Sequence, residues 1–144
     1  MMLDKVKLHQ KFSNWPLHIT IVSWFEISNL EIPRLIVAIE KITADLKPIR
    51  ITTTNINYYG RNNTIKVMEI KSNDELSLLR KKLIQTIETC KASPIEAYKD
   101  FKPHVTLNKY TQNLEKDNSF TLTKLLLVAK INDKLNQIVE ELKF

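Results

Sequence analysis

A stretch of ten residues occurs twice in this chain, and this duplication constrains the fold more than any other feature. Residues 15–24, WPLHITIVSW, align without gaps with residues 101–110, FKPHVTLNKY. In both copies an aromatic residue stands three positions before a histidine, a threonine two positions after it and a second aromatic six positions after it. The repeat predicts two equivalent strands that present the same side chains.

Side chains alternate between the two faces of a strand, so each copy has an aliphatic face and a more polar one. The more polar faces carry His18, Thr20, Val22 and Trp24 in the first copy, and His104, Thr106, Asn108 and Tyr110 in the second. If the aliphatic faces pack on helices, both His-x-Thr faces point away from those helices. A sheet that sets the two copies side by side would place two histidines and two threonines around one cleft.

Two amphipathic helices are predicted elsewhere in the chain. Capping boxes begin at Ser28 and at Ser72, each followed three residues later by a glutamate. Apolar residues then repeat at helical spacing, which predicts helices over residues 31–46 and 74–91.

Segments rich in β-branched and aromatic residues predict the strands. Residues 50–59 and 64–70 flank a turn sequence that contains Gly60 and two asparagines, so they should form a hairpin. Further strands are predicted over residues 17–24, 104–110, 120–131 and 136–143, although the last segment also suits helical spacing. We therefore expect an α+β fold in a single domain that spans residues 1–144.

Two histidines and two threonines suit acid-base chemistry on phosphate. With an ordinary pKa near 6.5, one imidazole of the pair can accept a proton while the other donates one. We expect His18 and His104 to divide these roles, and the hydroxyls of Thr20 and Thr106 to hold phosphate oxygens. In-line attack on a 2′,3′-cyclic phosphate needs a proton acceptor on one side and a donor on the other.

Metal binding is a rival use of histidine, and packing in the core is another. A zinc site takes three or four protein ligands, and no His, Cys, Asp or Glu has familiar ligand spacing beside either histidine of the repeat. We therefore expect no metal and no cofactor. His9 lies outside the repeat in a polar segment and should be a surface residue.

Aromatic side chains near the repeat could hold a base. Trp24 and Tyr110 are candidates for stacking on an unpaired nucleotide, or they could only close the edge of the core. Tyr58, Tyr59 and Arg61 at the tip of the hairpin could contact substrate or only solvent.

Composition narrows the partners and the cell compartment. The formal charge of +6 permits a nucleic-acid partner, and the single glycine excludes glycine-rich phosphate loops. Cys90 is the only cysteine, so no intrachain disulfide can form. We expect no secretory leader, because the first residues lack its basic-then-apolar layout, and no apolar run is long enough to span a membrane. We expect a cytoplasmic monomer.

The two motifs resemble those of the 2H phosphoesterase superfamily, which includes 2′-5′ RNA ligase-like proteins and 2′,3′-cyclic phosphodiesterases. Residues 16–21, PLHITI, and residues 101–107, FKPHVTL, match its paired His-x-Thr motifs. The resemblance implies a bilobal pseudo-twofold fold in which two antiparallel sheets surround a central cleft and the helices pack outside. It implies acid-base roles for the two histidines, phosphate contacts for the two threonines, and no required metal.

This resemblance leads to a functional hypothesis and to one alternative. The hypothesis is hydrolysis of a 2′,3′-cyclic phosphate, at an RNA end or on a small cyclic nucleotide, with reversible 2′-5′ RNA ligase activity as a further capacity. The alternative is a non-catalytic module of the same fold that binds RNA or a nucleotide.

Overall fold

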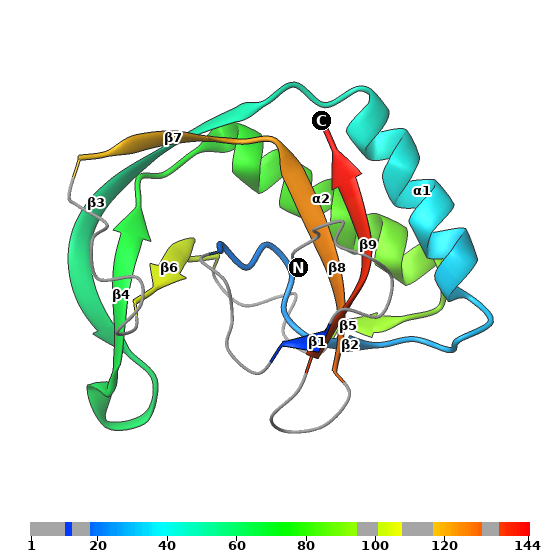
Figure 1. Cartoon of the computed structure of the whole chain (residues 1–144), viewed down its shortest axis with the longest axis horizontal. Helices are drawn as coiled ribbons and strands as arrows, with labels where there is room; N and C mark the ends of the chain where they lie inside the picture. Colours follow the sequence, from blue (N-terminus) through cyan, green and yellow to red (C-terminus); the bar gives the residue numbers. More distant parts are fainter. Residues whose placement is uncertain (1–10, 13–17, 95–100, 108–116, 131–135) are drawn as a thin grey trace.

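The computed structural model of the chain describes residues 11–12, 18–94, 101–107, 117–130 and 136–144 (Figure 1). The helices in this part of the chain are α1 (Ile32–Ala44), α2 (Asp74–Thr89) and the short 3-10 helix η1 (Arg61–Asn63). Its strands are β1 (Lys11–Phe12), β2 (Phe25–Glu26), β3 (Ile49–Tyr59), β4 (Ile65–Ile70), β5 (Ser93–Pro94), β6 (His104–Thr106), β7 (Ser119–Leu122), β8 (Lys124–Lys130) and β9 (Asn136–Lys143).

Both predicted helices are confirmed, each slightly shorter than expected. The buried positions of α1 are Leu35, Ile39 and Thr43, which recur every four residues along one face. In α2 the fully covered residues are Leu76, Leu79, Leu83 and Ile87, at the same helical spacing. The buried faces of α1 and α2 are the apolar stripes from which the two helices were predicted.

The predicted capping boxes are wrong in both helices. Glu31 occupies the N-cap of α1 without a side-chain cap, and the hydroxyl of Ser28 accepts a hydrogen bond from the Leu30 N–H instead. In α2 the cap is Asn73, whose side-chain oxygen accepts from the Leu76 N–H at 3.0 Å. Asparagine caps as well as serine does, and Asn73 stands directly before the first helical residue.

The four-stranded antiparallel sheet has the order β6, β4, β3, β7. Its centre is the predicted hairpin of β3 and β4, which is confirmed and pairs Tyr59 with Ile65 beside the turn. Gly60 has φ 81°, a left-handed conformation that glycine adopts without strain. Glu69 of β4 lies opposite His104 of β6, so the second His-x-Thr motif forms an edge of this sheet.

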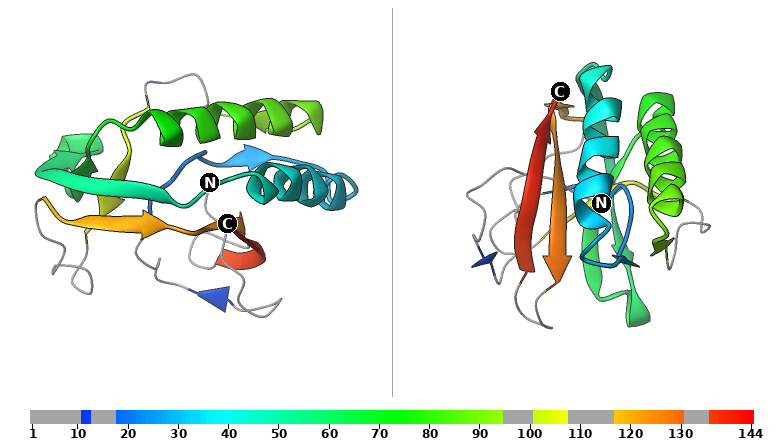
Figure 2. Two further views of the ribbon diagram at one scale, coloured as in Figure 1. Left: turned by 90° about the horizontal axis from the view of Figure 1, so that it is seen from above. Right: turned by 90° about the vertical axis from the view of Figure 1, so that its right-hand side faces the viewer.

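A three-stranded antiparallel sheet has the order β1, β9, β8, and β2 pairs with β5 in a separate two-stranded sheet. The strand predicted over residues 136–143 is confirmed as β9, so the helical alternative for that segment is wrong. Helix α1 contacts both α2 and β9. In both views of Figure 2, α1 lies between α2 and the β8–β9 strands.

The strand predicted over residues 17–24 is wrong for most of its described part. Within residues 18–24 the backbone makes a single bridge, between Ile19 and Val105, and then bends at residues 21 and 22. Ile21 and Val22 are both buried, which the strict alternation of a strand does not produce. The segment pairs with β6 of the four-stranded sheet at Ile19 and then leads into β2, which pairs with β5 in the two-stranded sheet. No single strand can therefore pair with its whole length.

Two further predicted strands differ from the structure. The segment 120–131 divides at Thr123 into β7, which pairs with β3, and β8, which pairs with β9. The carbonyl of Thr123 accepts a hydrogen bond from the Phe144 N–H, so the C-terminus holds the point where the chain changes sheets. In the described part of the strand predicted over 104–110, residues 104–107, the structure has β6, and residues 108–110 lie outside the described part.

A cluster of buried apolar side chains connects these elements. It includes residues from α1, α2, β3, β4, β8 and β9, together with Ile19 and Val105 of the two repeat copies. The architecture is α+β, with antiparallel curled sheets and two principal helices, as the sequence predicted.

Candidate active site

The two copies of the repeat meet at Ile19 and Val105, which form an antiparallel bridge. Both side chains are buried, at 5% and 1% exposed, so each copy presents its aliphatic face to the core. The flanking His18, Thr20, His104 and Thr106 are less covered than these two residues. The prediction that the aliphatic side of each motif faces inward is confirmed at these positions.

The antiparallel direction determines which polar residues lie across from one another. With Ile19 opposite Val105, His18 stands across from Thr106, and Thr20 stands across from His104. Opposed residues of an antiparallel pair have Cα atoms about 4.5–5.5 Å apart. The direction of the bridge thus places each histidine on the same side as the threonine of the other copy.

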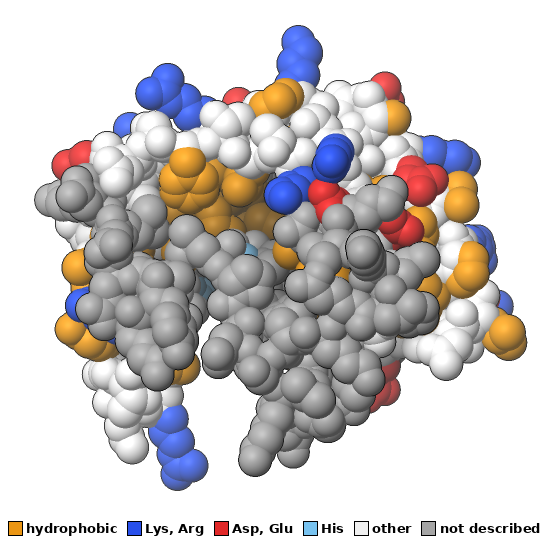
Figure 3. All heavy atoms as spheres, in the orientation of Figure 1, with side chains coloured by type: hydrophobic (Ala, Val, Ile, Leu, Met, Phe, Trp, Pro, Cys, Tyr) orange, Lys and Arg blue, Asp and Glu red, His pale blue; other side chains and the backbone are white. Residues whose placement is uncertain are grey.

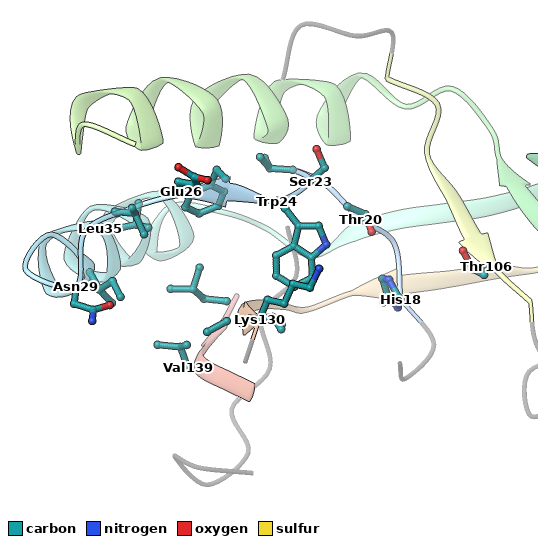
Figure 4. A pocket seen from close by; sticks show the side chains of 17 residues that line it. His18, Thr20, Ser23, Trp24, Glu26, Asn29, Leu35, Thr106, Lys130 and Val139 are labelled. Atoms are coloured by element: carbon teal, nitrogen blue, oxygen red, sulfur yellow. The ribbon is translucent and has the colours of Figure 1, made fainter. Parts of the chain in front are cut away.

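A pocket of about 630 Å³ opens beside these motifs. His18, Thr20 and Thr106 line one end of it (Figure 4). Leu35, Val128 and Val139 are among the aliphatic residues that line the rest. On the face shown in Figure 3, histidine atoms are visible beside apolar side chains. The pocket thus combines a polar end suited to phosphate with a larger apolar region.

Of the two aromatic candidates for base stacking, Trp24 is described and Tyr110 lies outside the described residues. Trp24 lines the pocket and is 41% exposed. Its indole lies between the histidine end and the apolar region in Figure 4. Trp24 is thus available to a ligand that enters the pocket.

His104 is held by the backbone next to it. Its Nδ1 lies 2.8 Å from the carbonyl oxygen of Lys102. Because a carbonyl can only accept a hydrogen bond, Nδ1 carries the proton, and Nε2 becomes the nitrogen that exchanges a proton with a ligand. This arrangement selects one tautomer of the neutral ring.

Tyr59 and Glu69 adjoin His104, and sequence reasoning placed only Tyr59 among the substrate-contact candidates. The rings of Tyr59 and His104 meet edge to face, with centroids 4.9 Å apart and an interplanar angle of 81°. The Tyr59 hydroxyl donates a hydrogen bond of 2.6 Å to Glu69 Oε2. Burial and the neighbouring Glu69 carboxylate raise the pKa of Tyr59 to about 12, so the phenol keeps its proton at physiological pH.

The structural signal for Glu69 is its register, which the sequence alone does not reveal. Tyr58, the neighbour of Tyr59, is 51% exposed. The residues that line the pocket include neither of these tyrosines, nor His104. Arg61 is also exposed, at the tip of the hairpin. His9, like Tyr110, lies outside the described residues.

Among the residues that the structure describes, no group of three or more His, Cys, Asp or Glu is placed to hold a metal ion. The expectation of a reaction without metal therefore stays a prediction. No helix in this same part of the chain is long and apolar enough to cross a membrane.

The chain thus has an α+β fold in which the two His-x-Thr motifs meet at one antiparallel bridge, next to a pocket lined by His18, Thr20 and Thr106. A family model described as the 2′-5′ RNA ligase superfamily matches residues 3–137. The chain therefore belongs to this superfamily, within the 2H phosphoesterases. No curated protein matches the chain.

Solved structures share the fold at low sequence identity. TT0787 of Thermus thermophilus has a TM-score of 0.66 and 17% identity, covering 88% of this chain and 77% of that one. A structure described as a phosphoesterase has a TM-score of 0.65 and 14% identity, covering 89% and 77%. E. coli LigT complexed with 3′-AMP has a TM-score of 0.63 and 15% identity, covering 89% and 76%. At these identities, the likeness establishes the fold alone.

Proposed function

We propose that this protein hydrolyses 2′,3′-cyclic phosphates of nucleotides or RNA ends, with His18 and His104 as the acid-base pair. The observation that carries the proposal is the antiparallel bridge between Ile19 and Val105. The bridge joins the two copies at the residue between each histidine and its threonine, which supports one shared site for both motifs. Two imidazoles at one site suit a displacement at phosphorus in which the nucleophile attacks from one side and the departing oxygen is protonated on the other.

In the proposed reaction, the oxygen of a water molecule attacks phosphorus, and the bond from phosphorus to one ribose oxygen breaks. One neutral imidazole accepts a proton from the water, and the other, protonated imidazole donates a proton to the departing oxygen. The products are a phosphate monoester and a free ribose hydroxyl. After turnover, one proton transfer between the histidines through solvent restores the starting state.

Thr20 and Thr106 are proposed to donate hydrogen bonds to the non-bridging phosphate oxygens. Both are exposed, and both line the pocket with His18. Hydroxyl donors placed where negative charge accumulates lower the barrier of a displacement at phosphorus. Since the two threonines come from opposite copies, they can contact two different oxygens.

The nucleoside is proposed to occupy the apolar region of the pocket, with Trp24 beside the base. The structure of LigT complexed with 3′-AMP supports a nucleotide ligand for this fold. A 3′-nucleotide is also the product class expected when the bond to the 2′ oxygen is cut. If a ribose 5′-hydroxyl of RNA attacks in place of water and the bond from phosphorus to the 3′ oxygen breaks instead, the product is a 2′-5′ linkage and a free 3′-hydroxyl, which is the proposed ligase reaction.

Turnover in the presence of EDTA tests this proposal. The substrates are the four nucleoside 2′,3′-cyclic monophosphates and a short RNA that ends in a 2′,3′-cyclic phosphate. Wild-type protein should hydrolyse at least one of them, and His18→Ala and His104→Ala should each abolish the reaction while retaining the wild-type melting temperature. His9→Ala, which changes the histidine outside the repeat, is the matched control and should keep full activity.

Two results would decide against the proposal. Full activity in either repeat variant would exclude the acid-base pair. Binding of the cyclic nucleotides that weakens with salt, without turnover of any substrate, would favour the non-catalytic binding module.

A further inference from the structure

We propose that Tyr59, anchored by Glu69, is a positioning residue that holds the imidazole of His104 in its reactive orientation. This inference rests on the proposed function, because it assigns His104 a proton-transfer role. Neither Tyr59 nor Glu69 belongs to the repeat. Both come from the β3–β4 hairpin, which supports the second motif.

The register of three strands brings these side chains to one face of the sheet. Tyr59 of β3 pairs with Ile65 of β4, and Glu69 of β4 pairs with His104 of β6. Ile65 and Glu69 are four residues apart on one strand, so they lie on the same face. Tyr59 and His104 therefore also face this way. Glu69 pairs with β6 through its backbone and accepts a hydrogen bond from Tyr59 of β3 through its carboxylate.

Two contacts restrict the imidazole from different directions. The carbonyl of Lys102 accepts from Nδ1 at 2.8 Å, and the ring of Tyr59 meets the imidazole edge to face. A hydrogen bond alone allows the ring to tilt about its axis, whereas an adjoining aromatic ring blocks that tilt. The pair of contacts keeps Nε2 directed toward one position.

The hydroxyl of Tyr59 fixes the aromatic ring in turn. A hydrogen bond of 2.6 Å to an ionised carboxylate is short and charge-assisted. The raised pKa of Tyr59 keeps this donor protonated over the whole physiological range. A misplacement of about 1 Å in a reacting group can cost on the order of a hundredfold in rate, so rigidity at this position matters to turnover.

The activity test distinguishes the role of the Tyr59 ring from that of its hydrogen bond to Glu69. On a cyclic nucleotide that the wild type hydrolyses, Tyr59→Leu should lower kcat about tenfold or more while KM stays within about twofold. Tyr59→Phe and Glu69→Ala should show smaller, similar losses, and the double variant should lose no more than either single one. Glu69→Gln should recover most activity, because its amide oxygen can accept the same hydrogen bond.

Tyr58→Leu is the matched control for Tyr59→Leu. Tyr58 occupies the next position of β3 and therefore points to the other face, where it is 51% exposed. Its replacement should leave kcat and KM at their wild-type values. Equal losses in the Tyr58 and Tyr59 variants would overturn the inference, because they would indicate a general effect on the hairpin.

A second measurement needs no substrate. Nitrogen NMR of the histidine rings should show His104 with its proton on Nδ1 in the wild type, and a mixture of tautomers in Tyr59→Leu. Wild-type kcat together with an unchanged tautomer in Tyr59→Leu would overturn the positioning role even if His104→Ala is inactive. If the wild type turns over no cyclic phosphate, the proposed function fails, and the tautomer comparison still decides whether Tyr59 orients the ring. Should Tyr59→Leu not fold, Tyr59→Phe and Glu69→Ala provide the same comparison.

Discussion

Ile19 and Val105 pair through one antiparallel bridge, and both side chains are buried in the same core cluster. The bridge thus couples the core of the protein to the geometry of the site. A change in the packing of either residue would shift a histidine and a threonine together. Stability and activity should therefore respond jointly to substitutions here.

Replacement of Ile19 tests this coupling. Ile19→Ala removes a side chain that is 5% exposed, so it should lower the free energy of unfolding by about 2–5 kcal/mol. It should also lower kcat in the folded protein, because the first motif loses its contact with the core. Urea denaturation and steady-state kinetics measure the two effects.

Ile56→Ala is the control for that substitution. Ile56 is 50% exposed, so its loss should change the free energy of unfolding by no more than about 0.5 kcal/mol. A cost for Ile19→Ala as small as this would contradict the structural importance of the bridge.

Thr106 should contribute to catalysis through its hydroxyl. Thr106→Ala removes one donor to the phosphate and should lower kcat about a hundredfold, whereas Thr106→Ser should keep most activity. Thr121→Ala is a suitable control because Thr121 is exposed on β7 and is not among the residues lining the pocket. An alanine variant of Thr106 with wild-type kcat would remove this threonine from the proposed mechanism.

Trp24 should contribute to binding of the nucleobase rather than of the phosphate. Stacking on an aromatic ring contributes about 1–3 kcal/mol per base, so Trp24→Ala should raise KM about tenfold or more, and Trp24→Phe should raise it less. The control is an abasic ribose 2′,3′-cyclic phosphate, whose KM should not change in Trp24→Ala. Equal losses on both substrates would instead indicate that Trp24 supports the pocket wall.

The elements that could be predicted from sequence are those determined by neighbouring residues. The helices follow from apolar spacing, and the β3–β4 hairpin follows from β-branched strands around a turn at Gly60. The segments that could not be predicted depend on distant partners. Residues 18–24 lie between two sheets, and the chain changes sheets at Thr123, so local propensity could not locate either break.

The candidate site divides in the same way. His18 and His104 stand out in the sequence because each belongs to a recognisable local pattern that occurs twice. Glu69 has no such pattern around it, and its place opposite His104 depends on the register between β4 and β6. Tyr59 was distinguishable from Tyr58 only once alternation along β3 was known.

The link between Tyr59 and Glu69 can also be measured by titration without any substrate. The pKa of Tyr59 is raised from 10.0 to about 12 by burial and by Glu69. One of the four tyrosines should therefore form its phenolate only near pH 12. A group that holds its proton more tightly when folded stabilises the fold fully below the unfolded pKa, and this contribution disappears as pH rises from 10 to 12. Ultraviolet absorbance of the phenolate should therefore show a late transition that Tyr59→Phe removes and Glu69→Ala moves to lower pH. A late transition that persists in Tyr59→Phe would assign it to another tyrosine and would contradict a partly buried, anchored phenol beside His104.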